Sequence, residues 1–215
     1  MSAKLKRDQL PPKKAENWRV NFSHESKLTF NLKVPKIILQ KETYKSLIGE
    51  NENRVRVYLG LEPEKKEGKY ELCAYAVSAF LLGSGDVYAD YETPVFKLSK
   101  KNENLSDNNK AVIESIRMYR KWRSGELDPD HEGASFRQYI YPNAYLLTKF
   151  ELHELFNAQS RPEIQMEFGI AKTMDVIIGP VSAARTGPTP VGDDDVFNNA
   201  GMCPPYCDER SIYNS

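Results

Sequence analysis

Several features that usually identify the class of a protein are scarce in this sequence. The 215 residues include only three cysteines and three histidines, and the formal net charge is zero, with 30 basic and 30 acidic side chains. Three cysteines do not make a disulfide framework, which fits a reducing compartment. A zero net charge creates no global field toward nucleic acid or anionic lipid. These absences favour a cytoplasmic protein that recognises its partners locally.

Long apolar runs are missing as well. No segment approaches the roughly 18 apolar residues that a membrane span needs, and the polar start MSAKLKRDQLPPKK has no apolar core of a signal peptide. The sequence therefore predicts no membrane partner. It also contains no phosphate-binding glycine loop, dinucleotide fingerprint or HExxH motif, which weakens an enzymatic interpretation without excluding it.

What the sequence does contain is an apparent internal repeat. Four blocks that begin at residue 37 are IILQKETYKSLI, RVRVYLGL, LCAYAVSA and DVYADYETP, and four blocks that begin at residue 145 match them in order: YLLTKFELHELF, EIQMEFGI, VIIGPVSA and DVFNNAGMC. Leu39 aligns with Leu147, and Gly60 aligns with Gly169. Length changes between the blocks fall in loop-like stretches, where insertions are tolerated. The repeat predicts two related units that pack together.

Each unit is predicted to contain a strand, a short helix and a hairpin. Alternation over 27–34 predicts the first strand, residues 41–48 have helical spacing, and residues 54–61 and 70–82 form the hairpin. The second copy repeats the helix over 147–159 and the strands over 163–170 and 174–181. In this alignment Ala76 matches Pro180 and Tyr88 matches Phe197.

We therefore expect an α+β protein in which two strand-helix-hairpin units, joined by a helix, adopt a pseudo-twofold arrangement. The expected boundaries are a flexible basic arm over 1–20, unit one over 21–104, a connecting helix and loop over 105–136, and unit two with an irregular tail over 137–215.

The connecting helix has a clear amphipathic pattern. Its apolar stripe consists of Val112, Ile113, Ile116, Tyr119 and Trp122. Its last turns carry the cations Arg117, Arg120, Lys121 and Arg123. Cations late in a helix complement the helix dipole, and this explanation is favoured over a nucleic-acid-binding face.

Cys203 and Cys207, in the sequence CPPYC, are the sharpest local signal. A stiff turn with two prolines can aim two thiolates at one soft metal such as zinc, which would need two further ligands. The candidates for those ligands are scattered through the chain. Three interpretations stay open: structural cysteines, a metal site and a redox pair. Asp193–Asp195 form a compact anionic loop of the kind that hard cations such as magnesium prefer. Only Asp195 has a counterpart in the first copy, Asp86, and a turn-capping role is the simpler explanation.

The second copy resembles small uncharacterised proteins of Bacteroidota. The resemblance rests on YLLTKFELHELF, EIQMEFGI, a short following strand and a terminal CPPYC, in that order. It covers roughly residues 141 to 214 and, through the repeat, a degraded version covers 34 to 99. It implies a shared origin and a shared tail from Cys203 to Cys207, but no activity. If single-copy relatives form homodimers, this chain is a covalently joined pseudo-dimer.

The sequence favours a non-catalytic interaction or assembly protein, because it offers a symmetric scaffold, aromatic content and no organised catalytic set. Strand edges of two hairpins can be covered by a neighbouring chain, so a homo-oligomer or a protein partner is expected. One alternative is a metal- or thiol-dependent enzyme that uses the CPPYC tail. Another is a small-molecule binder in the cleft between the repeats.

Overall fold

The computed structural model describes residues 6–25, 32–64, 69–83, 85–181, 196–198 and 200–214. The first half contains α1 (Pro12–Glu25), β1 (Ile37–Gln40), α2 (Lys41–Ile48), β2 (Arg54–Pro63), β3 (Tyr70–Leu81), β4 (Tyr88–Lys97) and β5 (Glu103–Asn104). Then come η2 (Ser106–Asn108), α3 (Asn109–Arg123), η3 (Ala134–Phe136), α4 (Arg137–Ile140), β6 (Ala144–Leu147), α5 (Lys149–His153) and the π-helical turn η4 (Glu154–Ala158). The chain ends with β7 (Glu163–Ile170), β8 (Met174–Pro180), β9 (Gly201–Cys203) and η5 (Ile212–Asn214).

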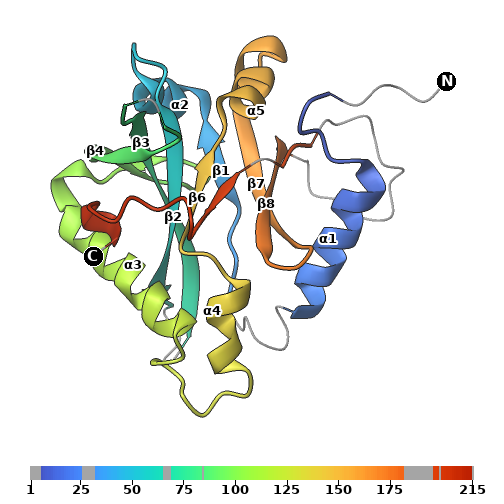
Figure 1. Cartoon of the computed structure of the whole chain (residues 1–215), viewed down its shortest axis with the longest axis vertical. Helices are drawn as coiled ribbons and strands as arrows, with labels where there is room; N and C mark the ends of the chain where they lie inside the picture. Colours follow the sequence, from blue (N-terminus) through green and yellow to red (C-terminus); the bar gives the residue numbers. More distant parts are fainter. Residues whose placement is uncertain are drawn as a thin grey trace.

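The strands form two antiparallel sheets, and the expected α+β class is confirmed. One sheet has three strands in the order β1-β7-β8, and the other has six in the order β5-β4-β3-β2-β6-β9. Figure 1 shows α3 beside β2 at one side of the molecule and α1 beside β7 and β8 at the opposite side.

The main core is made by the inward faces of both sheets. Val57 and Leu59 of β2 belong to the same buried cluster as Met166 of β7 and Val176 of β8. Alternation explains this placement, because every second side chain of a strand points to the same face. The Tyr145 hydroxyl of β6 also donates a hydrogen bond to the Met174 carbonyl oxygen at 3.0 Å, which links the two sheets.

Each sheet also has an outer face, and one helix covers it. Val112 and Ile116 of α3 pack in a second buried cluster with outward residues of the six-stranded sheet. Ala15 and Trp18 of α1 pack against Ile177 of the three-stranded sheet. The layers are therefore α1, the three-stranded sheet, the six-stranded sheet and α3.

The two halves of the chain exchange their first strands. Strand β1 pairs with β7 of the second half, with Ile37 opposite Met166. Strand β6 pairs with β2 of the first half, with Tyr145 opposite Val57. In the sequence alignment Ile37 matches Tyr145 and Val57 matches Met166, so the two pairings have the same register. This reciprocity supports the hypothesis of a duplicated, pseudo-twofold chain.

The helices on the outer faces follow the same exchange. A Cβ added at Gly60 of β2 would lie 2.5 Å from Ser115 Oγ of α3, and one added at Gly169 of β7 would lie 2.8 Å from Trp18 Cβ of α1. The aligned glycines thus let a helix approach the strand closely at the same place. If the chain is duplicated, helix α3, expected as a connector, corresponds to α1 and opens the second half.

Two positions of the alignment shift in the structure. Opposite the aligned residues Val57 and Met166 lie Ala76 and Ile178, so Ala76 corresponds to Ile178 and not to Pro180. Phe197 forms a bridge with Ile178, as Phe96 of β4 pairs with Ala76, so Phe197 corresponds to Phe96 and not to Tyr88. A pattern of alternating apolar residues matches itself equally well after a shift of two, which explains the first of these differences.

Residues 12–25 differ clearly from the expectation. Residues 12–25 form helix α1, where a flexible arm was expected over 1–20. The helix is held because Ala15 is fully buried and Trp18 packs on Gly169. The predicted strand over 27–34 lies mostly in residues 26–31, outside the described ranges, and the first described strand follows Pro35 instead.

The chain covers both edges of its three-stranded sheet. At β1, the Asn102 side chain accepts from Gln40 N at 2.9 Å and donates to Ile38 O at 2.7 Å. At β8, Phe197 exchanges two backbone hydrogen bonds with Ile178. Uncovered strand edges were the reason to expect self-association, and this reason does not apply to either edge of the three-stranded sheet. Within the described ranges, we find no helix of the length and apolar character that a membrane crossing requires.

Candidate functional site

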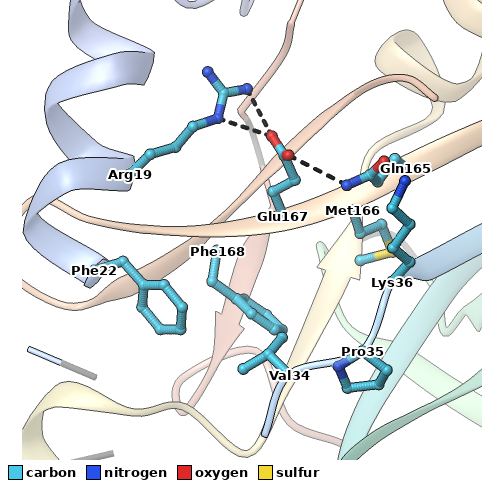
Figure 2. Close-up of a pocket in the computed structure, with 9 residues that line it drawn as sticks. All are labelled: Arg19, Phe22, Val34, Pro35, Lys36, Gln165, Met166, Glu167 and Phe168. Atoms are coloured by element: carbon cyan, nitrogen blue, oxygen red, sulfur yellow. Dashed lines mark hydrogen bonds and ion pairs between the residues drawn. The ribbon is translucent and has the colours of Figure 1, made fainter. Parts of the chain in front are cut away.

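A surface hollow of about 300 Å³ lies between α1 and β7. Its walls come from Arg19 and Phe22 of α1, from residues 34–36 before β1, and from residues 165–168 of β7 (Figure 2). The lining therefore combines the two halves of the chain, at the place where β1 of the first half meets β7 of the second.

The position of the hollow follows from the end of the β1–β7 pairing. Ile37 is the first residue of β1 and lies opposite Met166, so the chain before it leaves β7 at Lys36. Beyond this point Phe168 has no β1 residue beside it, and α1 crosses above. A gap remains between the helix, the departing segment and the strand.

An ion pair forms the polar rim. Arg19 Nε donates to Glu167 Oε2 at 2.8 Å, and Arg19 Nη2 lies 2.7 Å from the same oxygen. Gln165 Nε2 donates to Glu167 Oε1 at 3.2 Å. Both carboxylate oxygens are thus engaged, and the guanidinium is held in place (Figure 2).

The floor of the hollow is apolar, and the cationic side chain of Lys36 lies beside it. The rings of Phe22 and Phe168 lie 5.8 Å apart, and Val34 and Met166 extend the apolar surface. Lys36 is exposed and has no ion-pair partner among the residues that the structure describes. An apolar floor with a few placed polar groups at its rim is typical of a ligand pocket.

Cys203 and Cys207 are joined in a disulfide. Their Cα atoms lie 4.8 Å apart, Cys203 at the buried end of β9 and Cys207 partly exposed. In this oxidised state neither sulfur is a thiolate, so zinc would require the reduced protein. Nowhere in the described ranges do three or more His, Cys, Asp or Glu residues gather as a metal site. Zinc at these cysteines stays a prediction.

The cations at the end of α3 line a second hollow, of about 430 Å³. Arg120 Nη2 donates to the carbonyl oxygen of Tyr213 at 2.7 Å, and Arg123 donates to the carbonyl oxygen of Tyr141. Burial lowers the pKa of both guanidiniums. These arginines anchor neighbouring segments to the end of α3.

A third feature is the buried pair of Arg56 and Asp90 on the outer face of the six-stranded sheet. Arg56 Nε lies 3.0 Å from Asp90 Oδ1, and both side chains are at most 2% exposed. Tyr58 donates to Asp90 Oδ2, and Asp208 Oδ2 accepts from the Asp90 backbone N–H at 2.8 Å. The pair ties the C-terminal segment to the sheet.

Sequence reasoning missed Arg19 because it lies in the flexible arm expected over 1–20, and Phe22 because it lies just after that arm, before the first expected strand. The signal was present: Ala15, Trp18 and Phe22 recur at helical spacing, although charged residues surround them. The loop Asp193–Asp195, singled out from the sequence, lies outside the described residues.

Comparisons with known proteins add no relative. The chain matches no model of a known protein family, no curated protein and no solved structure. The argument for function therefore rests on the geometry of the hollow between α1 and β7.

Proposed function

We propose that the protein is a non-catalytic interaction protein that binds a partner through the hollow between α1 and β7. One observation carries the proposal: an apolar floor from both halves of the chain lies beside a cation, Lys36, that has no ion-pair partner among the described residues. This arrangement suits an apolar group that carries a carboxylate.

The two parts of the site have different tasks. Phe22 and Val34 supply most of the apolar area, because Phe168 is only 4% exposed. Lys36 favours a ligand with a negative charge, because an uncharged or cationic ligand leaves the Lys36 ammonium group unpaired. The Arg19–Glu167 ion pair fixes the shape of the rim.

The test uses 3-(4-hydroxyphenyl)propanoate as a probe and its amide as the uncharged control. Titration is followed by NMR through the Arg19 Nε–H and Phe168 N–H signals. We expect saturable shifts with a Kd of about 1 mM, because roughly 0.3 kcal/mol per non-hydrogen atom over about 12 atoms gives about −4 kcal/mol.

Lys36→Gln should weaken this binding, while Lys110→Gln, an exposed lysine on α3 at the opposite side of the molecule, should leave it unchanged. If the acid causes no saturable shift at these signals, or if the amide binds equally well, the proposed site is wrong.

A further inference from the structure

The second hollow, at the C-terminal end of α3, is strongly cationic. Its volume is about 430 Å³. Four cations and one carboxylate line it, together with a hydroxyl and an amide: Arg117, Arg120, Lys121, Arg123, Glu126, Ser124 and Asn143. Within the described ranges no other acidic residue lines this hollow, so its positive charge is not balanced by its own walls.

The single carboxylate does not neutralise any of the four cations. Glu126 Oε1 accepts a hydrogen bond from the Ser124 hydroxyl at 2.7 Å, and Glu126 forms no ion pair with a described residue. Lys121 is exposed, and in the described part of the chain its ammonium group has neither a hydrogen bond nor an ion pair. The charge of Lys121 is therefore available to a ligand.

Two of the guanidiniums are held in place by neutral groups. Arg120 Nη2 donates to the carbonyl oxygen of Tyr213 at 2.7 Å. Arg123 Nη2 donates to the carbonyl oxygen of Gln138. These bonds position the side chains without removing their charge. Burial lowers the pKa of Arg120, and the positive charges of Arg123 and Arg117 lower it further. Because a guanidinium keeps its proton, an anion in the hollow would relieve this repulsion.

Capping of α3 does not explain the cluster. The carbonyl oxygens of residues 120, 121 and 122 already accept hydrogen bonds from the backbone N–H groups of residues 124, 126 and 125, at 2.8, 2.8 and 3.1 Å. The dipole at a helix C-terminus amounts to roughly half an elementary charge. Four cations exceed that charge several-fold, so most of their charge needs another partner.

One hydrogen-bond acceptor accompanies the cations. Asn143 Oδ1 is buried and has no hydrogen-bond partner among the residues that the structure describes. A buried amide oxygen is costly to leave without a donor. A hydroxyl group of a ligand in the hollow would supply that donor.

We propose that the hollow at the end of α3 binds a small phosphate monoester that carries hydroxyl groups, such as a sugar phosphate. The phosphate would lie beside Lys121, Arg117 and Arg123, and a hydroxyl would donate to Asn143 Oδ1. A phosphate suits this cluster better than a carboxylate, because it carries close to two negative charges at pH 7 and three acceptor oxygens. The volume of about 430 Å³ suits a small organic molecule.

This inference is independent of the proposed function. Helices α1 and α3 lie at opposite sides of the molecule, so the two hollows are separate sites (Figure 1). The failure of one therefore leaves the other unaffected.

The test uses ribose 5-phosphate, with inorganic phosphate and ribose as controls for its two parts. Binding to the full-length protein in a phosphate-free buffer is followed by NMR through the backbone N–H signals of Ser124 and Glu126. We expect saturable shifts with a Kd on the order of 1 mM for a ligand of this size. Inorganic phosphate should bind roughly fivefold more weakly, because it lacks the sugar hydroxyls. Ribose should cause no saturable shift.

Variants locate the binding. Lys121→Gln should weaken the binding of ribose 5-phosphate about tenfold. Lys110→Gln, an exposed lysine at the other end of α3, should leave it unchanged. Asn143→Ala should lower the affinity for ribose 5-phosphate to that for inorganic phosphate. The affinity of this variant for inorganic phosphate should equal that of the wild type, which also shows that the variant is folded.

Three results would overturn the inference. The first is the absence of a saturable shift with ribose 5-phosphate, or an affinity that Lys121→Gln does not change. The second is equal affinity for inorganic phosphate and ribose 5-phosphate, which would assign the hollow to a free anion. The third is an oligothymidylate that binds more than about tenfold more tightly than ribose 5-phosphate and depends on Lys121, which would assign the hollow to single-stranded nucleic acid.

Discussion

Arg56 shows how a charge can be placed in the interior of this fold. On β2 its side chain alternates with the core residues Val55 and Val57, so it points to the outer face. That face is covered, and Arg56 is compensated by Asp90 at 3.0 Å and by the Tyr88 carbonyl oxygen at 3.0 Å. Burial raises the pKa of Asp90, and the positive charge of Arg56 opposes this rise.

Replacing Arg56 with methionine should destabilise the protein by about 3–5 kcal/mol at pH 7, because a buried carboxylate is left without its partner. Without Arg56 the pKa of Asp90 rises further, so the folded state takes up a proton. The stability from this proton is fully present below the ordinary aspartate pKa of about 4 and is lost as the pH rises.

The loss of stability should therefore be smaller at pH 4 than at pH 7, as measured by urea unfolding at both values. Arg54→Met is the matched control, since Arg54 stacks on the Tyr88 ring at 4.7 Å and is only partly buried. Its effect should stay below about 1 kcal/mol and should not change over this range. A destabilisation of Arg56→Met that is independent of pH would contradict this account.

The cysteines give a second prediction at this scale. A disulfide that closes a loop of this length stabilises a fold by about 2 kcal/mol in the chain-entropy relation. The double variant Cys203→Ser and Cys207→Ser should lose about this amount of unfolding free energy, and Cys73→Ala serves as a control for the loss of a thiol elsewhere.

The reduced wild-type protein should lose about as much stability as the double variant. If reduction followed by addition of zinc restores the stability of the wild type but not of the variant, the cysteines bind metal as the sequence predicted. A variant as stable as the oxidised wild type would show that the disulfide has no structural role.

The sequence predicted the burial of single residues only where that burial depends on one layer of packing. Val112 and Ile116 were expected in the apolar stripe of their helix, and both are buried. Arg56 was not expected to be buried, because alternation along a strand shows which face a residue takes but not whether another layer covers that face. Arg19 was missed for a related reason, since the helix that carries it is held by tertiary packing.

At the scale of elements, the close approach of a helix to a strand occurs twice. Gly60 lies under α3 and Gly169 under α1, and at neither position is there room for a methyl group. The alternating strands and amphipathic helices were readily predicted: residues 54–61, 70–82, 163–170 and 174–181 all fall in strands, with small differences at their ends. The pairing within each hairpin was predicted, but the pairings of β1 with β7 and of β6 with β2 were not, because periodicity contains no information about which distant strands lie side by side.

Gly60→Ala and Gly169→Ala should each destabilise the fold by roughly 1–3 kcal/mol, since the helix must move away from the strand. Gly85→Ala is the control, because a Cβ there would meet nothing closer than 3.9 Å. Unfolding free energies from denaturant titration measure all three. Equal stability of the Gly169 variant and the wild type would show that α1 does not pack on β7 as described.

At the scale of the whole molecule, the exchange of first strands predicts a single cooperative unfolding transition. Trp18 lies in α1 on the three-stranded sheet, and Trp122 lies in the main core with the rings of Tyr119 and Tyr141. With both tryptophans labelled with 5-fluorotryptophan, their ¹⁹F signals should lose native intensity at the same urea concentration. Two separate midpoints would show that the halves are independent.

The expectation of a homo-oligomer stays a prediction. Because both edges of the three-stranded sheet are covered, we expect the contact between copies at another surface. Leu81, Leu82, Val87 and Tyr91, near the end of the β3–β4 hairpin, are all at least 41% exposed. Self-association through this patch should raise the mass measured by light scattering at high concentration, and Val87→Asp should abolish the rise. An unchanged monomer mass in the wild type would contradict this prediction.

The exchanged strands also set an order of events on the ribosome. Ile37 pairs with Met166, so the first helix and strand are made well over a hundred residues before the strand that receives them. At a synthesis rate of about 5–20 residues per second, this delay is on the order of ten seconds. During that time hairpins such as β2–β3 can form locally, but the apolar side of β1 cannot yet be buried against β7. The nascent chain therefore exposes the apolar segment β1 until the later half of the chain has been made and covers it.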